Sequence, residues 1–346
     1  MKLQVSVDEH PSEVALRGSA LVPEPGRAPM ARIATDFVRS WGTALILVLL
    51  VVVFSVSAPA FLTLRNIQDV LIVQTVSGVM TLGVMFPLIV GEFDLSVGYL
   101  VGFLAVLGAY LGGHGAGAAV VIPCMLGAGL LVGVFNGVLT QTAKISSFIA
   151  TLGVGIVLEG LTEGLSGGQV LYSGIPRLVD QIGGSYAGPF AISVWVTIGL
   201  AALLLGLLEY TPAGRSLYAV GGSERVAFLA GLRVNRLKIG AFALSGLLVG
   251  VAAIFALGQS GSANPGFGPD LLLPAYAAAF LGVTTYRAGY YNVVGSVVGI
   301  LLLAVGFNGL SLLGVPFWAQ PIFNGGVLLV AVMVARAEAR RVKVGS

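Results

Sequence analysis

The chain has 346 residues, of which 57% are hydrophobic and only 10% are charged, and its mean hydropathy is +0.98. A soluble domain carries about 25% charged residues, so this composition cannot cover a protein with a water-facing surface, and lipid must be the main solvent. The 50 glycines follow no Gly-X-Y period, and the chain is too apolar for disorder, which excludes collagen-like and disordered proteins.

Residues 1–40 are polar and contain no apolar run. A cleavable signal peptide has an apolar stretch directly after a short charged region, so we predict a flexible cytoplasmic tail. Residues 41–335 are predicted to form the transmembrane domain, and residues 336–346 a basic cytoplasmic tail. A spanning helix needs roughly 20 apolar residues, and apolar runs recur throughout the domain. They cover Thr43–Ala58, Val70–Val90, Leu95–Leu111, Ala116–Thr140, Ile145–Leu165, Phe190–Leu208, Ile239–Leu257, Leu271–Val283, Val293–Leu313 and Phe317–Val334.

These runs predict an all-α polytopic membrane protein of about ten transmembrane helices, some of them broken or re-entrant. With the N-terminus inside, all but two of the 18 lysines and arginines fall in cytoplasmic segments, the exceptions being Arg65 and Arg177. Cytoplasmic loops are the ones that carry excess Lys and Arg. We therefore predict an even number of spans with both termini cytoplasmic, and the positions of the charges argue against nucleic acid as a partner.

Glycines recur at every fourth position in several runs, for example Gly129, Gly133 and Gly137, and again Gly246 and Gly250. Each row places a stripe of small residues on one helix face, where backbones can approach closely. We interpret these stripes as ordinary helix packing.

Two connections are long enough to form structures of their own. The predicted outside loop, residues 167–189, is rich in glycine. The predicted inside loop, residues 209–238, is the largest connection and carries a cluster of cations; it is called the coupling loop below.

Within the coupling loop, Ser223 is a predicted N-cap, Glu224 suits the positive end of a helix, and Gly231 is a predicted stop. We predict a helix of about two turns between them, which is marginal alone. It must dock on the membrane or on a partner protein, and we favour the partner.

Catalytic chemistry has almost no support in the sequence. Gly-Lys occurs nowhere, which excludes a GxxxxGK[ST] phosphate-binding loop. His10 and His114 lie in the polar tail and in a short outside loop, and Cys124 is the only cysteine. Neither HExxH nor GxSxG occurs. We predict no catalytic residue, no metal site and no cofactor in this chain.

Intramembrane ionisable residues are few, and the most distinctive are Glu92 and Asp94 in IVGEFDLSVG. Acids at such a place face protein, water or a helix N-terminus. One hypothesis is a broken helix that lines a pathway, where both carboxylates and Ser96 contact a polyhydroxylated solute. The alternative for Asp94 is a cap of the next helix through the backbone N–H of Ser96 or Val97. Glu92 has no capping role, which makes it the better pathway candidate.

Asn136, Asn308 and Asn324 each precede a glycine inside an apolar run. Buried amides can tie helices together at about 0.6 kcal/mol each, and they can also bind sugar hydroxyls. We favour the structural interpretation.

Four stretches make the chain resemble the permease subunits of bacterial sugar ABC importers of the ribose, xylose, arabinose and galactose type. Branched-chain amino acid permeases are more distant relatives. The stretches are FLTLRNI (61–67), GEFDLSVG (91–98), GVFNGVL through SSFIATLG (133–153) and TPAGRSLYAVGGSERVAFLAGL (211–232). They resemble, in the same order, that family's second span, its GGIDLSVG signature, its NG and PPFIATLG segments and its coupling segment.

The resemblance implies a multi-pass protein of the bacterial cytoplasmic membrane that moves a small polar solute, with a monosaccharide expected. It implies a second permease subunit, identical or different, two cytoplasmic ATPase subunits that bind ATP and Mg²⁺, and an extracytoplasmic solute-binding protein. The short helix would be the coupling helix that contacts the ATPase, through Gly222, Ser223, Glu224, Ala227 and Gly231. Within the predicted pathway, Asn136, Phe148 and Thr151 join the residues of the GEFDLSVG stretch.

The chain departs from the family pattern at several positions. Glu92 replaces the second glycine of the signature, Ser146 and Ser147 replace two prolines, and Ser223 replaces an asparagine. These changes leave the identity of the solute open.

A proton- or sodium-coupled carrier is the alternative function. A carrier should show embedded acids and basic partners that form a relay, whereas here the acids cluster at span ends and no Lys or Arg lies in the middle of a predicted span. An intramembrane hydrolase lacks both a Ser–His pair and two mid-span aspartates.

Overall fold

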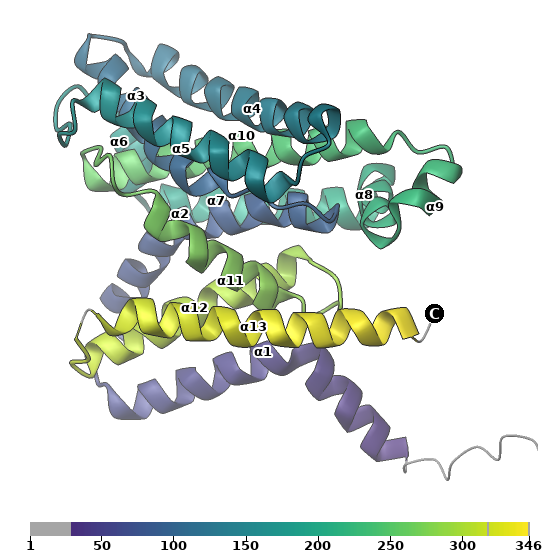
Figure 1. Cartoon of the computed structure of the whole chain (residues 1–346). Helices are drawn as coiled ribbons and strands as arrows, with labels where there is room; N and C mark the ends of the chain where they lie inside the picture. Colours follow the sequence, from purple (N-terminus) through teal and green to yellow (C-terminus); the bar gives the residue numbers. More distant parts are fainter. Residues whose placement is uncertain (1–28, 317, 345–346) are drawn as a thin grey trace, which may run out of the picture. The chain divides into compact units, whose positions relative to one another are not determined.

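A computed structural model of the chain describes residues 29–316 and 318–344. Residues 1–38 form one unit and residues 39–346 another, and the described part of the first unit is the beginning of helix α1 (Figure 1). The predicted tail therefore lies outside the described residues up to position 28, while α1 already begins at Pro29.

Regular structure in the described residues is almost entirely helical. The helices are α1 (Pro29–Ser57), α2 (Leu64–Ile89), α3 (Ser96–Gly113), α4 (Ala118–Ala143), α5 (Ser147–Ser166), α6 (Arg177–Gly184), α7 (Ile192–Tyr210), α8 (Pro212–Gly222), α9 (Glu224–Leu229), α10 (Val234–Ser260), the 3₁₀ turn η1 (Pro269–Leu271), α11 (Leu272–Gly282), α12 (Val293–Leu312) and α13 (Ala319–Val344). The predicted all-α class is thereby confirmed.

Every predicted apolar run forms a helix, namely α1 to α5, α7 and α10 to α13. In the described residues, 7 helices are long and apolar enough to cross a membrane, and Trp41–Ser57, Pro269–Gly282 and Ala319–Met333 are shorter apolar helices. A polytopic membrane protein is therefore confirmed.

The last described helix extends beyond the apolar run. Helix α13 continues to Val344, so it includes most of the predicted basic tail, residues 336–346. The stretch ARAEARRVKV is rich in Ala, Arg, Glu and Lys, which are strong helix formers, so nothing in this sequence ends the helix at the edge of the apolar run.

Helices α2, α3 and α10 form the centre of the bundle. Of the most apolar window of α2, 78% is buried, against 22% for α4 and for α7. Val79, Phe86, Leu104 and Phe255 are almost completely buried there. The apolar side chains on the outer faces of α4, α5 and α7 are exposed, as expected for surfaces that meet lipid or another subunit.

The predicted glycine stripes lie where helices make their closest contacts. Along α4, Gly129 faces Gly246 of α10, and Gly133 faces the carbonyl oxygen of Phe242. Gly295 of α12 likewise faces Gly282 of α11. Figure 1 shows α11, α12 and α13 side by side. The packing interpretation of the stripes is confirmed.

The long loop between α5 and α7 has more structure than we predicted. It contains α6 and a two-stranded antiparallel hairpin, β1 (Tyr186–Ala187) and β2 (Phe190–Ala191), in which Tyr186 pairs with Ala191. Gly188 at the hairpin turn has φ +68°, a conformation that favours glycine. Val179 of α6 is fully buried, and Gly183 of α6 packs closely against Gly258 of α10.

Candidate functional site

The coupling loop contains the predicted short helix, α9. The Ser223 side chain caps it by accepting a hydrogen bond from the backbone N–H of Val226 at 3.4 Å. Gly231, two residues after the last helical residue, has φ +83°, which is the left-handed conformation that ends many helices. The cap, the stop and the helix itself are confirmed to within one residue.

Helix α9 exposes most of its apolar side chains. Val226, Phe228 and Leu229 are 64%, 69% and 76% exposed. Of the predicted coupling residues, Ala227 is the buried one, at 3% exposure, and it anchors α9 on the bundle. Gly222, Ser223 and Gly231 lie on the surface. The structure shows a small, exposed, apolar protrusion with a single buried contact residue.

Helix α8, which we did not predict, holds the coupling loop on the bundle. Gly221 packs closely on the carbonyl oxygen of Ile89 at the end of α2. The Tyr218 hydroxyl donates to the carbonyl oxygen of Tyr291 at 2.8 Å, and Arg287 forms an ion pair with Glu209 at 2.8 Å. Burial, helped by the Glu209 carboxylate, raises the pKa of Tyr218 to about 12, so its hydroxyl keeps its proton at physiological pH.

The GEFDLSVG stretch forms an interruption between two helices, residues 90–95, which is called the helix break below. Helix α2 ends at Ile89, Gly91 turns the chain at φ +81°, and α3 begins at Ser96. The Asp94 carboxylate accepts hydrogen bonds from the Ser96 backbone N–H at 3.2 Å and from the Ser96 hydroxyl at 2.6 Å. The capping alternative for Asp94 is therefore confirmed.

Asp94 is also the centre of a network that joins three helices. The Asn136 side-chain amide of α4 donates to the Ser96 hydroxyl at 2.7 Å and to the Asp94 carboxylate at 3.3 Å. The Ser245 hydroxyl of α10 donates to the same carboxylate at 3.5 Å. Asp94, Ser96 and Asn136 are 0% exposed, so the network holds α3, α4 and α10 together in the interior.

The backbone of the helix break is held by two further helices. The Phe93 N–H donates to the Ser147 hydroxyl at 3.1 Å, and the Leu95 N–H donates to the Thr151 hydroxyl at 2.9 Å. Both hydroxyls belong to α5. The Tyr276 hydroxyl of α11 accepts from the Asp94 N–H and donates to the Asp94 carbonyl oxygen, each at 2.9 Å.

Glu92, near the start of the helix break, contacts charged residues of the coupling loop. Its carboxylate binds the ammonium of Lys238 at 2.9 Å, and the same ammonium binds Glu224 at 2.8 Å. No local pattern pairs Glu92 with Lys238, because the two lie 146 positions apart along the chain. Phe148, the remaining predicted pathway residue, is 50% exposed on α5. Solute contact at all these positions stays a prediction.

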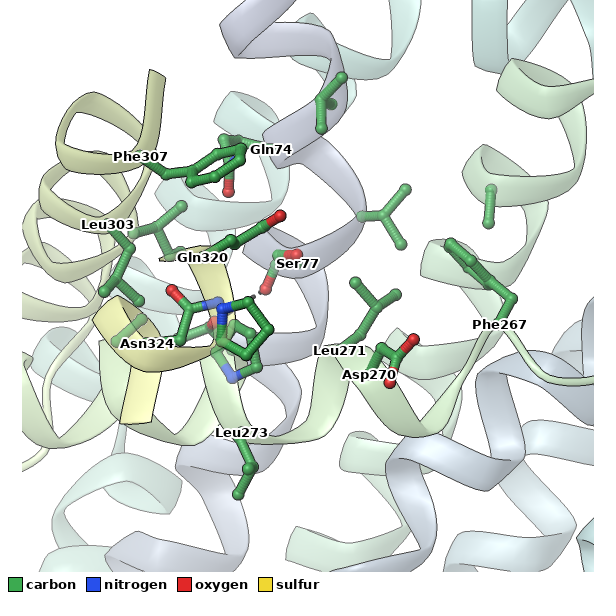
Figure 2. A pocket seen from close by; sticks show the side chains of 18 of the residues that line it. Gln74, Ser77, Phe267, Asp270, Leu271, Leu273, Leu303, Phe307, Gln320 and Asn324 are labelled. Atoms are coloured by element: carbon green, nitrogen blue, oxygen red, sulfur yellow. Dashed lines mark hydrogen bonds between the residues drawn. The ribbon is translucent and has the colours of Figure 1, made fainter. Parts of the chain in front are cut away.

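A cavity of about 610 Å³ opens elsewhere in the bundle, between α2, α10, α11, α12 and α13. Its wall is mostly apolar and carries a minority of polar side chains, for which it is called the polar cavity below. Figure 2 shows Gln74 and Ser77 of α2 close to Gln320 and Asn324 of α13 around this space. Ligand pockets have volumes of about 300–1,000 Å³, so a small solute fits.

One acid and two aromatic rings also line the cavity, and most of the remaining wall is aliphatic. Asp270 of η1 lines it, together with Phe267 and Phe307 (Figure 2). Amides, hydroxyls and a carboxylate exchange hydrogen bonds with polyhydroxylated molecules. Such a wall is chemically suited to a neutral polar solute.

Of the cavity residues, sequence reasoning noted only Asn324. The pattern that could have found several of the others is helical spacing of polar residues inside apolar runs, since Gln74, Ser77 and Thr81 lie three and four residues apart, and Gln320 and Asn324 lie four apart. No cluster of three or more His, Cys, Asp or Glu residues that could hold a metal occurs among the residues that the structure describes.

Comparisons with known proteins agree with this architecture. Residues 66–333 match the family described as branched-chain amino acid transport system / permease component. The chain is 32% identical over 306 residues to the ribose import permease protein RbsC of Escherichia coli strain K12, which covers 86% of this chain and 95% of the relative.

Two further relatives are named for other pentoses. Identity is 35% over 294 residues to the L-arabinose ABC transporter permease protein AraH of Azospirillum brasilense, covering 84% of this chain and 86% of the relative. It is 28% over 347 aligned positions to the xylose transport system permease protein XylH of Escherichia coli strain K12, covering 82% and 87%. No solved structure gives a significant match. The chain belongs to the branched-chain amino acid transport system / permease component family, as a transmembrane subunit of an ABC importer in the bacterial cytoplasmic membrane.

Proposed function

We propose that the chain carries a monosaccharide across the membrane while a separate ATPase, which binds ATP and Mg²⁺, supplies the energy. The names of the relatives, which are ribose, arabinose and xylose permeases, support a pentose or similar sugar. The chain itself would then be no enzyme.

The single observation that carries this proposal is the exposed apolar surface of α9. Val226, Phe228 and Leu229 project from a helix of 6 residues. So short a helix gains little stability by itself, and apolar groups clustered on a protrusion mark a contact surface. We assign this surface to the ATPase subunit. Ala227 would remain the anchor on the permease, and Glu224, Gly222, Ser223 and Gly231 would hold α9 in its docking position.

The topology that we propose has about ten spans, formed by α1 to α5, α7 and α10 to α13. Both termini and the coupling loop then lie in the cytoplasm, which places Arg215, Arg225, Arg233 and Arg236 on the side where positive charge accumulates. In this topology, the polar cavity between α2, α12 and α13 would lie toward the outer side of the membrane. A solute-binding protein would deliver the sugar there, and a second permease subunit would complete the path.

The test is reconstitution of the permease with its ATPase and binding protein in liposomes. We expect import of radiolabelled D-ribose, L-arabinose or D-xylose that requires ATP and the ATPase. A secondary carrier would instead import solute with the permease alone when a proton or sodium gradient is applied. Import of that kind, or ATP-dependent import that survives removal of the α9 apolar side chains, would contradict the proposal.

A further inference from the structure

Three charged side chains from three separate elements meet at one point, and they are called the ion triad below. The ammonium of Lys238, at the start of α10, lies 2.9 Å from the Glu92 carboxylate of the helix break and 2.8 Å from the Glu224 carboxylate of α9. The Lys238 side chain is 8% exposed, that of Glu92 17% and that of Glu224 58%.

The two ion pairs differ in how firmly they hold. The pair of Lys238 with Glu224 is open to water, where solvent and salt weaken attraction. The pair of Lys238 with Glu92 is shielded, and a buried charge that loses its partner is strongly destabilising. The inner pair is therefore the stronger contact of Lys238, and the outer pair adds a weaker one to α9.

Chain connectivity makes Lys238 move with α9. Only residues 230–233 separate α9 from α10, and the Leu232 N–H bonds back to the Ala227 carbonyl oxygen at 3.0 Å. Glu224, in the first turn of α9, also binds the Lys238 ammonium. The α9 helix and the first turns of α10 thus form one small body.

Glu92 belongs to a different segment of the chain, the helix break. It lies two residues before Asp94, in the segment that is bonded to α5 through Ser147 and Thr151 and to α11 through Tyr276. A displacement of Glu92 therefore acts on a segment that α2 and α3 flank and to which α4, α5, α10 and α11 bond. Besides the inner ion pair, the contact of Gly221 with the Ile89 carbonyl oxygen also joins the coupling loop to this segment.

We infer that the ion triad links α9 to the helix break, so that movement of the coupling helix is passed through Lys238 and Glu92 to the ends of α2 and α3. Glu92 is then a positioning residue for energy coupling and has no contact with the solute. This inference rests on the proposed function, because it needs an ATPase subunit to move α9. Rigid-body movement of packed helices at a subunit contact is a known route for such transmission.

The experiment uses the reconstituted importer and measures how many ATP molecules are hydrolysed for each sugar imported. The sugar is whichever of radiolabelled D-ribose, L-arabinose and D-xylose the wild-type complex transports. We expect Glu92→Gln and Lys238→Met to raise this ratio by at least about fivefold, the lower end of usual coupling between sites. The amount of assembled complex is measured in the same samples.

Two further variants separate the link from other effects of charge. Lys144→Gln removes an exposed lysine from the connection between α4 and α5, and it should leave the ratio unchanged. The triple exchange Glu92→Lys, Lys238→Glu and Glu224→Lys reverses every charge but keeps both pairs. We expect it to bring the ratio back to within about twofold of wild type, since opposite charges again meet at both contacts.

Each outcome decides the matter. An unchanged ratio in the assembled single variants overturns the link. A smaller amount of assembled complex with a normal ratio also overturns it, because a purely structural role of the ion triad would have that effect. A triple exchange that assembles but stays uncoupled also overturns it. A change in which sugar is transported, with a normal ratio, would show that Glu92 contacts the solute. If the wild-type complex imports no sugar with ATP, the proposed function fails instead.

Discussion

Gly129 of α4 and Gly246 of α10 lie backbone against backbone, so that a Cβ atom added to either one would collide with the carbonyl oxygen of the other. Lipid tails are as apolar as the side chains, so helices in a membrane associate through such close packing rather than through the hydrophobic effect. The contact lies in the pairing of α4 with α10, which also carries Asn136 and Ser245 to the Asp94 network.

Gly129→Leu should therefore destabilise the permease strongly. Overpacking typically costs about 1–3 kcal/mol, and here the collision is with backbone that cannot rotate away. We expect a clear fall in the unfolding temperature of the detergent-solubilised protein. Gly127→Leu is the matched control, because a Cβ at Gly127 meets nothing within 4 Å. Equal losses in the two variants would show that helix propensity or lipid contact, and not this packing, sets the effect.

The Asp94 network predicts a graded response to substitution. Asp94→Ala would leave the Ser96 hydroxyl, the Ser96 N–H and the Asn136 amide without their shared acceptor. A buried group that loses its partner costs about 1–3 kcal/mol. Asp94→Asn keeps one acceptor oxygen and should cost less.

The measurement is the unfolding temperature, together with the fraction of protein that stays monodisperse in detergent. Asp180→Ala on α6, an exposed acid, should change neither. If Asp94→Ala is as stable as wild type while import stops, the carboxylate would contact solute or ions and the capping role would be secondary.

Local features of this protein could be predicted from sequence, and long-range contacts could not. The Ser223 cap and the Gly231 stop depend on residues within one helical turn, and the apolar runs depend on composition alone, so both were visible. The partner of Glu92 is Lys238, which is 146 positions away, and no local pattern brings the two together. Helix α8 was not predicted, although the Thr211 cap and Pro212 at the first helical position are local signals of a helix start.

The three asparagines make the same point. Asn136 and Asn308 do tie helices together, Asn308 by mutual hydrogen bonds with Asn66 at 2.9 and 3.0 Å. Asn324 instead lines the polar cavity. All three precede a glycine in an apolar run, so their surroundings, which the sequence does not contain, decide their roles.

Removing apolar surface from α9 should weaken the ATPase without harming the permease. Phe228→Ser and Leu229→Ser change side chains that are 69% and 76% exposed, so the unfolding temperature should stay the same. Burying such a side chain at an interface contributes about 1.5–3 kcal/mol, and each variant should bind the ATPase about tenfold more weakly or worse. Affinity is measured between the permease in nanodiscs and the purified ATPase.

Leu131→Ser is a suitable comparison for α9, since Leu131 is 69% exposed on the membrane face of α4. It should leave ATPase affinity unchanged. Normal ATPase binding by both α9 variants would mean that α9 lies on the lipid surface and that another part of the coupling loop contacts the ATPase.

The polar cavity predicts that Asn324 and Asn308 respond differently to the same change. Asn308→Leu would remove the side chain that exchanges hydrogen bonds with Asn66. It should lower the free energy of unfolding by about 1 kcal/mol or more, with little effect on the KM for import.

Asn324→Leu breaks no hydrogen bond between residues that the structure describes, so stability should be kept. Because the proposed topology has the sugar delivered to this cavity, loss of one neutral hydrogen bond should raise the KM for import roughly threefold to tenfold. The check is concentration-dependent uptake of the sugar that wild type imports, at saturating solute-binding protein. If Asn324→Leu leaves KM and maximal rate untouched, the sugar takes a path outside this cavity, and Phe148 on the exposed face of α5 becomes the next position to test.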